Sequence, residues 1–372
     1  QNRRMSSFTL LLTGVSINAM AMAAILFLHY SAGFSQSFAI VRWLMGGIGS
    51  RDYMTLTALA VGICISFSIT MKKSNQLNLF DRKNQRKIHT RHVPRLGGVA
   101  VISGILITLI YFFIEVPFPM GTREPYSLLL FSIITMFILG IIDDLINIQP
   151  SLKLFIQFLL AFILVWKADI YIHSFNGLFD IYNLPIWISY IFSILVLVFI
   201  INAYNIIDGI DGLSSSVGIL ALIIYFGIFI FNKNYFDSLL SLSVMGSLFG
   251  FWLQNKPPAN IFMGDSGTLT IGLLLAYFSI KISMLPLDFQ GNINPVFPMV
   301  VLAYPVIDTL RVFTIRIYSG HSPFRADRNH IHHKLVGLGF SHGKSTAIII
   351  SFNICLVITS YMLRDNSTLS YF

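Results

Sequence analysis

The chain has 372 residues, of which 55% are hydrophobic and only 11% are charged, and its mean hydropathy is +0.74. Soluble domains carry about 25% charged residues. The composition therefore excludes an ordinary soluble protein and indicates an integral membrane protein. The formal net charge of +9 raises the question of a nucleic-acid partner, which the distribution of the charge along the chain answers.

Eleven apolar runs have the length that a membrane-spanning helix needs, about 20 residues. They predict an all-α, polytopic membrane protein with about 11 transmembrane helices. The predicted spans are residues 8–30, 54–71, 97–115, 126–142, 152–168, 186–204, 214–232, 235–253, 267–284, 295–315 and 345–363. We divide the chain into an extra N-terminal helix with its connector (1–53), a multi-helix domain (54–363) and a short external tail (364–372).

Lysine and arginine are distributed unevenly between the two sides that these spans define. With the N-terminus inside, 17 of the 25 Lys and Arg residues fall in inside segments, seven fall outside, and Arg311 lies within a span. Cytoplasmic loops carry an excess of Lys and Arg. We therefore place the N-terminus in the cytoplasm and the C-terminus outside. The positive charge is explained by topology, so we expect no nucleic-acid partner.

The chemically rich segments all fall on the inside with this topology, whereas the outside loops are short and bland. The inside loops are 72–96, 143–151, 205–213, 254–266 and 316–344. We therefore expect one cytoplasm-facing site that is built from these five loops.

A polar stretch with two amides and two carboxylates lies between two very apolar runs. It reads Asn202-Ala-Tyr-Asn205-Ile-Ile-Asp208-Gly-Ile-Asp211-Gly. Ionisable groups at such a place are costly and usually functional. Their oxygens suit a hard cation, although the spacing is not that of an EF-hand. The alternative is a polar turn, because Asp-Gly pairs are common in turns.

Two further acidic motifs precede or follow apolar runs. Asp143 and Asp144 end one run, and Lys153 follows nine residues after the second acid. Adjacent carboxylates repel each other and invite a cation, so this is either a Mg²⁺ or base site, with Lys153 on a phosphate, or an ordinary solvated helix end. Asp265 stands between glycines at the start of a span, where exposed amides suit a phosphate; the plainer interpretation is an N-capping aspartate.

A cationic segment near residue 330 combines Arg328 with His330, His332 and His333. Arginine and histidine together suit a diphosphate. A zinc site is the competing interpretation, but it requires further ligands in a plausible geometry. A membrane-anchoring loop would explain the arginine and lysine here, but not three histidines.

Two other basic features have plainer explanations. The loop 81–98 contains His89 and Arg95, and positive-inside charge accounts for most of its composition. Arg311 follows Asp308 by three residues within a span, so we expect the two to form an ion pair.

Taken in order, these motifs resemble those of the polyprenyl-phosphate N-acetylhexosamine-1-phosphate transferases, over roughly residues 54–363. The branch typified by WecA and TagO is the most similar, because its His-Ile-His-His form is present rather than the histidine run of the MraY branch. The motifs are Arg86-Lys87-x-His89, Pro94-x-x-Gly97-Gly98, Asp143-Asp144, Asn202-x-x-Asn205-x-x-Asp208-Gly-x-Asp211-Gly, Phe262-Met-Gly-Asp265 and Asp327-Arg-x-His330-Ile-His-His333.

The resemblance implies the transfer of an N-acetylhexosamine 1-phosphate, most often GlcNAc 1-phosphate, from a UDP-sugar to undecaprenyl phosphate with release of UMP. It implies Mg²⁺ as cofactor, with Mn²⁺ as a substitute, and a homodimer. It also implies a bacterial cytoplasmic membrane, with the active site on the cytoplasmic face, and the initiating step of cell-envelope glycan synthesis.

The resemblance also assigns roles to residues. Asn205 and Asp265 would hold the metal. The candidate catalytic acids are Asp143, Asp144, Asp208 and Asp211. One of the first two would orient or deprotonate the lipid phosphate, and the last two would shape the nucleotide pocket or support the metal. The candidate substrate-binding residues are Lys153, Asn202, Arg328, His330, His332, His333, His89 and Arg95.

Three alternatives remain open at this point. An ion-coupled transporter also carries intramembrane acids, but these usually lie near the bilayer midplane and within inverted repeats. A zinc-dependent intramembrane hydrolase would use the histidines. A relative with the same chemistry and a different UDP-amino sugar differs from the first prediction only in its donor.

Overall fold

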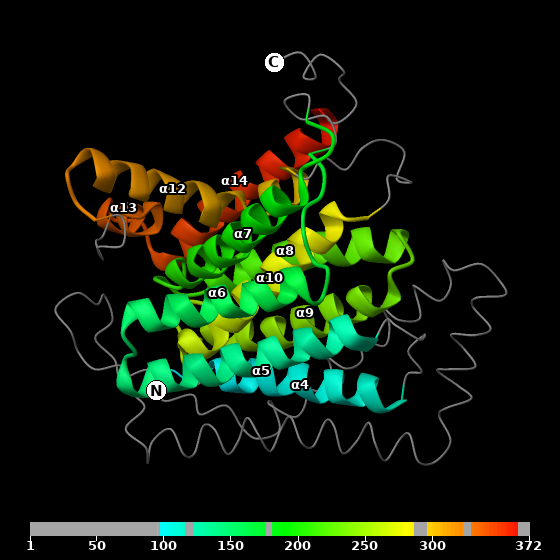
Figure 1. Ribbon diagram of the computed structural model, residues 1–372. Helices are drawn as coiled ribbons and strands as arrows, with labels where there is room; N and C mark the ends of the chain where they lie inside the picture. Colours follow the sequence, from blue (N-terminus) through cyan, green and yellow to red (C-terminus); the bar gives the residue numbers. More distant parts are fainter. Residues whose placement is uncertain are drawn as a thin grey trace, which may run out of the picture.

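The computed structural model describes residues 95, 97–115, 123–175, 181–285, 296–322 and 329–363, which form helices and connecting loops without a strand (Figure 1). The all-α prediction is confirmed. The predicted spans 8–30 and 54–71, the predicted tail 364–372, and the candidates His89 and Arg328 lie outside the described residues.

The apolar runs become helices close to the predicted bounds. The helices are α4 (Gly97–Glu115), α5 (Arg123–Ile146), α6 (Pro150–Trp166), α7 (Ile186–Ile206), α8 (Leu213–Phe231), α9 (Tyr235–Asn255), α10 (Gly264–Ser283), α11 (Val296–Val301), α12 (Ala303–Tyr318), α13 (Ile331–Gly337) and α14 (His342–Leu363). Proline marks two of the starts, at the first position of α6 and just before α7, where its missing N–H costs nothing.

Six of these helices are long and apolar enough to cross a membrane, namely α5, α7, α8, α9, α10 and α14. The apolar parts of α4 (Gly97–Ile110) and of α6 (Pro150–Trp166) are shorter. The protein is therefore a multi-pass membrane protein. Of the other predicted spans, 8–30 and 54–71 lie outside the described residues. The spans 97–115 and 152–168 correspond to the shorter apolar helices, and 295–315 is broken into two helices.

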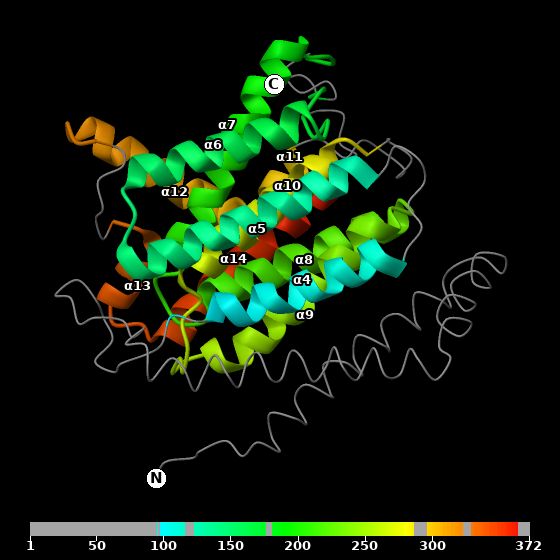
Figure 2. The ribbon, with the colours of Figure 1, turned by 60° about the horizontal axis from the view of Figure 1, so that its bottom comes forward.

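Helix α10 is the centre of the bundle. Its apolar stretch is 94% buried inside the protein, against 17% for α14 at the periphery. It packs against α4, α5, α7 and α8, and α4, α5, α8 and α9 run alongside one another (Figure 2). Close approach depends on glycine at Gly272, where a Cβ would lie 3.0 Å from the Cα of Ile201 on α7. Helix α10 is therefore enclosed by neighbouring helices on several sides.

The prediction of one continuous span over 295–315 is wrong, because the helix breaks at Leu302 between α11 and α12. Pro305 has no N–H, so the carbonyl of Val301 loses its helical donor. The Asn353 side chain of α14 takes over: its Nδ2 donates to the Val301 oxygen (2.9 Å), and its Oδ1 accepts from the Tyr304 N–H (3.1 Å). A buried amide from another helix thus satisfies the backbone at the break.

The helix ends that carry the polar motifs gather at one end of the bundle. The end of α5 meets the start of α6 and of α10, the end of α7 meets the start of α10, and the loop after α7 meets the end of α9 and the start of α14. The α13 helix lies at this end, on the left of Figure 1. The described parts of the predicted inside loops therefore come together as expected.

Candidate active site

Glycines bring the first turn of α10 into contact with α4 and α5. A Cβ at Gly140 would lie 2.4 Å from the Cα of Ser266, and a Cβ at Gly98 would lie 2.2 Å from the backbone nitrogen of Gly267. Gly264 begins the helix with φ +72°, a left-handed conformation that other residues seldom adopt. These positions let three helices meet at backbone distance.

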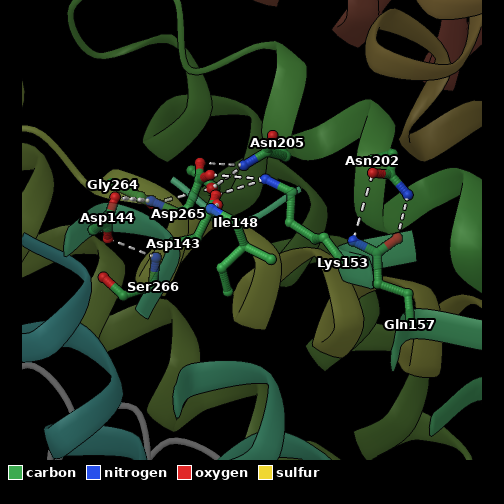
Figure 3. A network of polar contacts seen from close by, with 11 residues as sticks. Asp143, Asp144, Ile148, Lys153, Gln157, Asn202, Asn205, Gly264, Asp265 and Ser266 are labelled. Atoms are coloured by element: carbon green, nitrogen blue, oxygen red, sulfur yellow. Dashed lines mark hydrogen bonds and ion pairs between the residues drawn. The ribbon is translucent and has the colours of Figure 1, made fainter. Parts of the chain in front are cut away.

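The carboxylate of Asp144 caps α10 from the neighbouring helix α5. Its two oxygens accept the backbone N–H groups of Asp265 (2.8 Å) and Ser266 (3.0 Å) (Figure 3). A negative charge there compensates the helix dipole and satisfies amides that have no helical partner. These contacts favour a positioning role for Asp144 over the general-base role considered from the sequence.

The ammonium group of Lys153 joins two carboxylates. Its Nζ lies 2.7 Å from Oδ2 of Asp143 and 2.9 Å from Oδ2 of Asp265, so α5, α6 and α10 meet at one cation (Figure 3). The other oxygen of Asp143 accepts the N–H of Ile148 at 2.8 Å. The Asp265 side chain is 32% exposed, against 8% for Asp143 and 18% for Lys153. Asp265 is therefore the more accessible of the two carboxylates.

Asn205, at the end of α7, completes this cluster. Its Nδ2 donates to Oδ1 of Asp265 at 2.8 Å and to Oγ1 of Thr268 at 2.6 Å. The two residues that the resemblance assigned to the metal are thus direct neighbours, although they are 60 positions apart in the chain.

Asn202 lies one turn earlier on α7 and pairs with Gln157 of α6. Its Nδ2 donates to Gln157 Oε1 at 2.5 Å and to the carbonyl of Val198 at 2.8 Å. The structure thus engages Asn202 between helices, although it was predicted to bind substrate. Gln157 was missed by sequence reasoning. The available signal was a polar residue in an apolar run, four positions after Lys153 and so on the same helix face.

The loop after α7 carries Asp208, whose Oδ1 accepts the Ser214 hydroxyl at 2.5 Å. Burial raises the pKa of Asp208 to about 7; the Ser214 hydrogen bond opposes this rise, the negative charge of Asp265 adds to it, and Arg95 opposes it. Asp208 is thus electrostatically coupled both to Arg95 and to the cluster of Asp143, Lys153, Asn205 and Asp265, which we call the Lys153 cluster.

Asp211 holds three segments together. Its Oδ2 accepts the N–H of Ala259 at 3.1 Å and lies 3.3 Å from Nδ1 of His342 at the start of α14. The residue is only 4% exposed. These contacts indicate that Asp211 shapes the site by fixing the loops, and His342 is a partner that sequence reasoning did not single out.

Asp308 of α12 organises the start of the histidine segment. Its Oδ2 lies 2.9 Å from Nδ1 of His330, and its Oδ1 accepts the Ile331 N–H at 3.0 Å. The predicted ion pair between Asp308 and Arg311 is confirmed at 2.8 Å. Arg311 also donates to the carbonyl of Asn329 at 2.5 Å.

His332 is the most deeply buried histidine of the segment, with 0% exposed against 5% for His330. Its Nδ1 lies 2.9 Å from the Tyr304 hydroxyl. A Cβ at Gly209 would lie 2.5 Å from its Nε2. The histidine segment therefore packs directly on the loop that contains Asp208. Burial lowers the pKa of His332 to about 3, and the neighbouring His333 and His330 lower it further. His332 is therefore neutral near pH 7 and adds no charge for a bound anion.

The oxygens around Asp265 are suitable for Mg²⁺. Two carboxylates, Asp143 and Asp265, already converge on one cation, the Lys153 ammonium, and the amide of Asn205 adjoins them. Mg²⁺ is typically held by one or two carboxylates together with waters and substrate phosphates. No group of three or more His, Cys, Asp or Glu in the described ranges is arranged to hold a metal ion. The donor set thus fits a metal that substrate phosphates help to bind.

Lysine, arginine, histidine and carboxylate groups therefore meet at one end of a bundle of membrane helices. Cationic groups of this kind suit a phosphorylated ligand. The class defined by fold and site is a multi-pass membrane protein with a cluster of charged and polar side chains at one end of its helices.

The chain is similar to known proteins over most of its length. The model of glycosyl transferase family 4 matches residues 126–283, which include the Lys153 cluster and the loop after α7. A "Probable undecaprenyl-phosphate N-acetylglucosaminyl 1-phosphate transferase" from Bacillus subtilis (strain 168) is 30% identical over 82% of both chains. A "Decaprenyl-phosphate N-acetylglucosaminephosphotransferase" from Mycobacterium leprae is 29% identical over 82% of this chain and 81% of its own.

A third relative is the "Undecaprenyl-phosphate alpha-N-acetylglucosaminyl 1-phosphate transferase" of Yersinia pestis, 26% identical over 76% of both chains. The FecCD transport family model matches residues 1–86, a range outside the described residues that contains none of the candidate site residues. The chain belongs to glycosyl transferase family 4, and the resemblance inferred from its motifs is confirmed.

Proposed function

We propose that this protein transfers N-acetylglucosamine 1-phosphate from a UDP-sugar to undecaprenyl phosphate, or to a closely related polyprenyl phosphate, and releases UMP. The names of the relatives support the reaction and its acceptor. The structural observation that supports it best is the Lys153 ammonium between Asp143 and Asp265, where three helix ends meet. A site at helix ends is accessible to both a lipid phosphate and a water-soluble nucleotide.

The reaction exchanges one phosphorus–oxygen bond for another. An oxygen of the acceptor phosphate forms a bond to the phosphorus that carries the sugar, and the bond from that phosphorus to UMP breaks. Phosphoryl transfer leaves little covalent work to the protein, so positioning and charge stabilisation dominate. Lys153 supplies positive charge for this purpose, while Asp144 and the glycines fix Asp265 in place.

Asp143 has an orienting role in this proposal rather than that of a base. The second pKa of a phosphate monoester is about 6, so the acceptor is already largely deprotonated at neutral pH. Asp143 holds Lys153 and the N–H of Ile148, contacts that position the ammonium group for the acceptor phosphate.

Asn205 and Asp265 would hold Mg²⁺, with Mn²⁺ as a substitute. The metal would neutralise charge on the donor's diphosphate. His330 and His333 are proposed to contact that diphosphate, together with Arg328, while Arg95 and His89 add positive charge. The excess of Lys and Arg on the predicted inside supports a cytoplasmic active site in a bacterial inner membrane. A homodimer is carried over from the resemblance alone.

UMP release by the purified full-length protein tests the proposal. We expect release from UDP-GlcNAc only when undecaprenyl phosphate and Mg²⁺ are both present, and loss of release in Asp265→Ala. Release from a different UDP-amino sugar alone would keep the reaction and change the donor. Absence of release from every donor in the panel, with transport of a solute into vesicles, would favour a transporter instead.

A further inference from the structure

Two side chains of α12 contact the histidine segment from one face of the helix. Tyr304 and Asp308 are four residues apart, so they lie one above the other. Tyr304 contacts His332, and Asp308 contacts His330. The helix begins at the break that Asn353 bridges, so its first residues are fixed by α14. This face of α12 therefore holds two of the three histidines in different ways.

The contact between Asp308 and His330 joins a carboxylate to a ring nitrogen. Asp308 is fully buried, and its carboxylate accepts from the His330 ring, the Ile331 N–H and Arg311. A carboxylate on one ring nitrogen keeps the proton there and fixes the orientation of the ring. Because Ile331 is the first residue of α13, the same carboxylate also fixes where that helix begins.

The contact of His332 is different in kind. Its partner is the neutral hydroxyl of Tyr304, its side chain is fully buried, and it packs against Gly209. No carboxylate contacts its ring among the described residues. His330 is buried as well, so the two histidines differ in their partners rather than in burial. His330 meets a carboxylate, whereas His332 connects α12 with the loop after α7 through a hydroxyl and a glycine.

We propose that Asp308 is a positioning residue for donor binding that acts through His330, whereas His332 is a neutral structural link between α12 and the loop of residues 207–212. The proposal rests on the proposed function, because the ligand that His330 meets is the donor's diphosphate. The proposal assigns His330 to the ligand and His332 to the packing of the fold.

A double-mutant cycle tests the coupling. Asp308→Asn, His330→Gln and the double variant are compared by calorimetric binding of UDP-GlcNAc and by the KM values for donor and acceptor. We expect each single variant to weaken donor binding about tenfold, the size of one hydrogen bond to a charged group, with the acceptor KM unchanged. The double variant should bind no more weakly than His330→Gln, since one interaction is removed in each case.

Matched control variants separate a role of Asp308 in donor binding from a role in protein stability. Asp237→Asn changes an equally buried aspartate that accepts from Tyr277 and Asn234. Asp237 lies 18 residues before the site end of α9, about 27 Å away at 1.5 Å per residue. We expect this variant to lower thermal stability and leave donor affinity unchanged. Arg311→Gln removes the other ionic partner of Asp308, and Asp308→Glu should restore part of the donor affinity.

Several results would overturn the proposal. Donor affinity equal to wild type in Asp308→Asn would do so, as would additive losses in the double variant or a loss in Arg311→Gln as large as that in Asp308→Asn. If Asp308→Asn does not fold, wild-type donor affinity in His330→Gln overturns it. Failure of the proposed function is distinguishable, because then wild-type protein neither binds UDP-GlcNAc nor releases UMP.

Discussion

Lys153 is held by carboxylates from two other helices, and this single residue links the acid pair of α5 with Asp265 of α10. Removing one partner from a partly buried charge cluster leaves charges without compensation, which is costlier than the pair itself is stabilising. In the proposed reaction, both catalysis and local stability therefore depend on Lys153. Replacing Lys153 should slow transfer more than replacing any surface lysine does.

Lys153→Met should lower the rate of UMP release by about 10²–10³-fold, the usual size of losing one preorganised charge in an active site. Lys167→Met is the matched control, because Lys167 is an exposed lysine just after the same helix, over the ring of Trp166. We expect near wild-type transfer in the control. Equal rates in Lys153→Met and wild type would contradict the role given to this cation.

Because the pKa of His332 is lowered to about 3, we expect this residue to make the stability of the protein depend on pH. The unfolded chain binds a proton at this residue near pH 6.5, whereas the folded protein does not until about pH 3. Stability is therefore lost as the pH falls from about 6.5, by about 1–2 kcal/mol at pH 5. His332→Asn should lose less stability between pH 7.5 and pH 5 than wild type, measured by thermal unfolding in detergent. Identical pH dependence in both would refute a neutral, buried His332.

Residue chemistry was predictable from the sequence where partners are near in the chain. The Asp308–Arg311 pair follows from helical spacing. The ion pair of Lys153 with Asp143 was not predicted, because Lys153 was expected on a phosphate. The partners of Asp144, Asn202 and His330 were not predictable, because they come from helices far away in the sequence. A local pattern shows that a polar group is present, but not which distant backbone amide or side chain it meets.

Helix α10 shows how packing positions the site at the scale of an element. Its start is fixed by glycines of α4 and α5 and by the carboxylate of Asp144. Glycine has no side chain to separate the helices, so the site residues of three helices meet within hydrogen-bond distance. The sequence predicted where α10 lies in the chain, but not that it is the buried centre. The run 267–284 is no more apolar than the runs that became peripheral helices.

Gly140→Ala should push α5 and α10 apart, because its Cβ would lie 2.4 Å from the Cα of Ser266. Overpacking of this kind costs about 1–3 kcal/mol, and we expect transfer to fall at least about tenfold as Asp265 shifts. Gly246→Ala in α9 is the control, since nothing lies within 4 Å of its added Cβ. Alanine favours a helix by up to about 1 kcal/mol, so this variant should be as stable as wild type or more so.

If Gly140→Ala kept wild-type thermal stability and transfer, the close approach of α5 and α10 would not be what places Asp265.

The break between α11 and α12 is a second case in which contacts between helices decide the structure of an element. Pro305 signals an interruption, but a proline alone does not tell whether the helix bends or breaks. The deciding side chain, Asn353, lies almost 50 residues further along the chain.

The whole molecule is a bundle in which the polar helix ends lie on one side. The distribution of Lys and Arg predicts that this side faces the cytoplasm. This orientation stays a prediction, and it depends on loop composition rather than on tertiary contacts. In this orientation a soluble donor would approach from inside the cell.

Single cysteines test this orientation. In a variant with Cys64 and Cys355 replaced by serine, we place a cysteine at exposed Lys233 or at exposed Ser341. A membrane-impermeant maleimide added to intact cells should label Lys233→Cys and leave Ser341→Cys unlabelled until the membrane is opened. The reverse pattern would place the site on the outer face and exclude a cytoplasmic donor.

The fate of the donor phosphate distinguishes transfer of a sugar phosphate, as proposed, from transfer of the sugar alone. UDP-GlcNAc labelled at the phosphate next to the sugar is incubated with the purified protein, undecaprenyl phosphate and Mg²⁺, and the lipid product is analysed by mass. The proposed reaction moves the label to the lipid, which then carries GlcNAc on a diphosphate, while the nucleotide leaves as UMP. Label that remains on released UDP, with the sugar alone on the lipid, would contradict it.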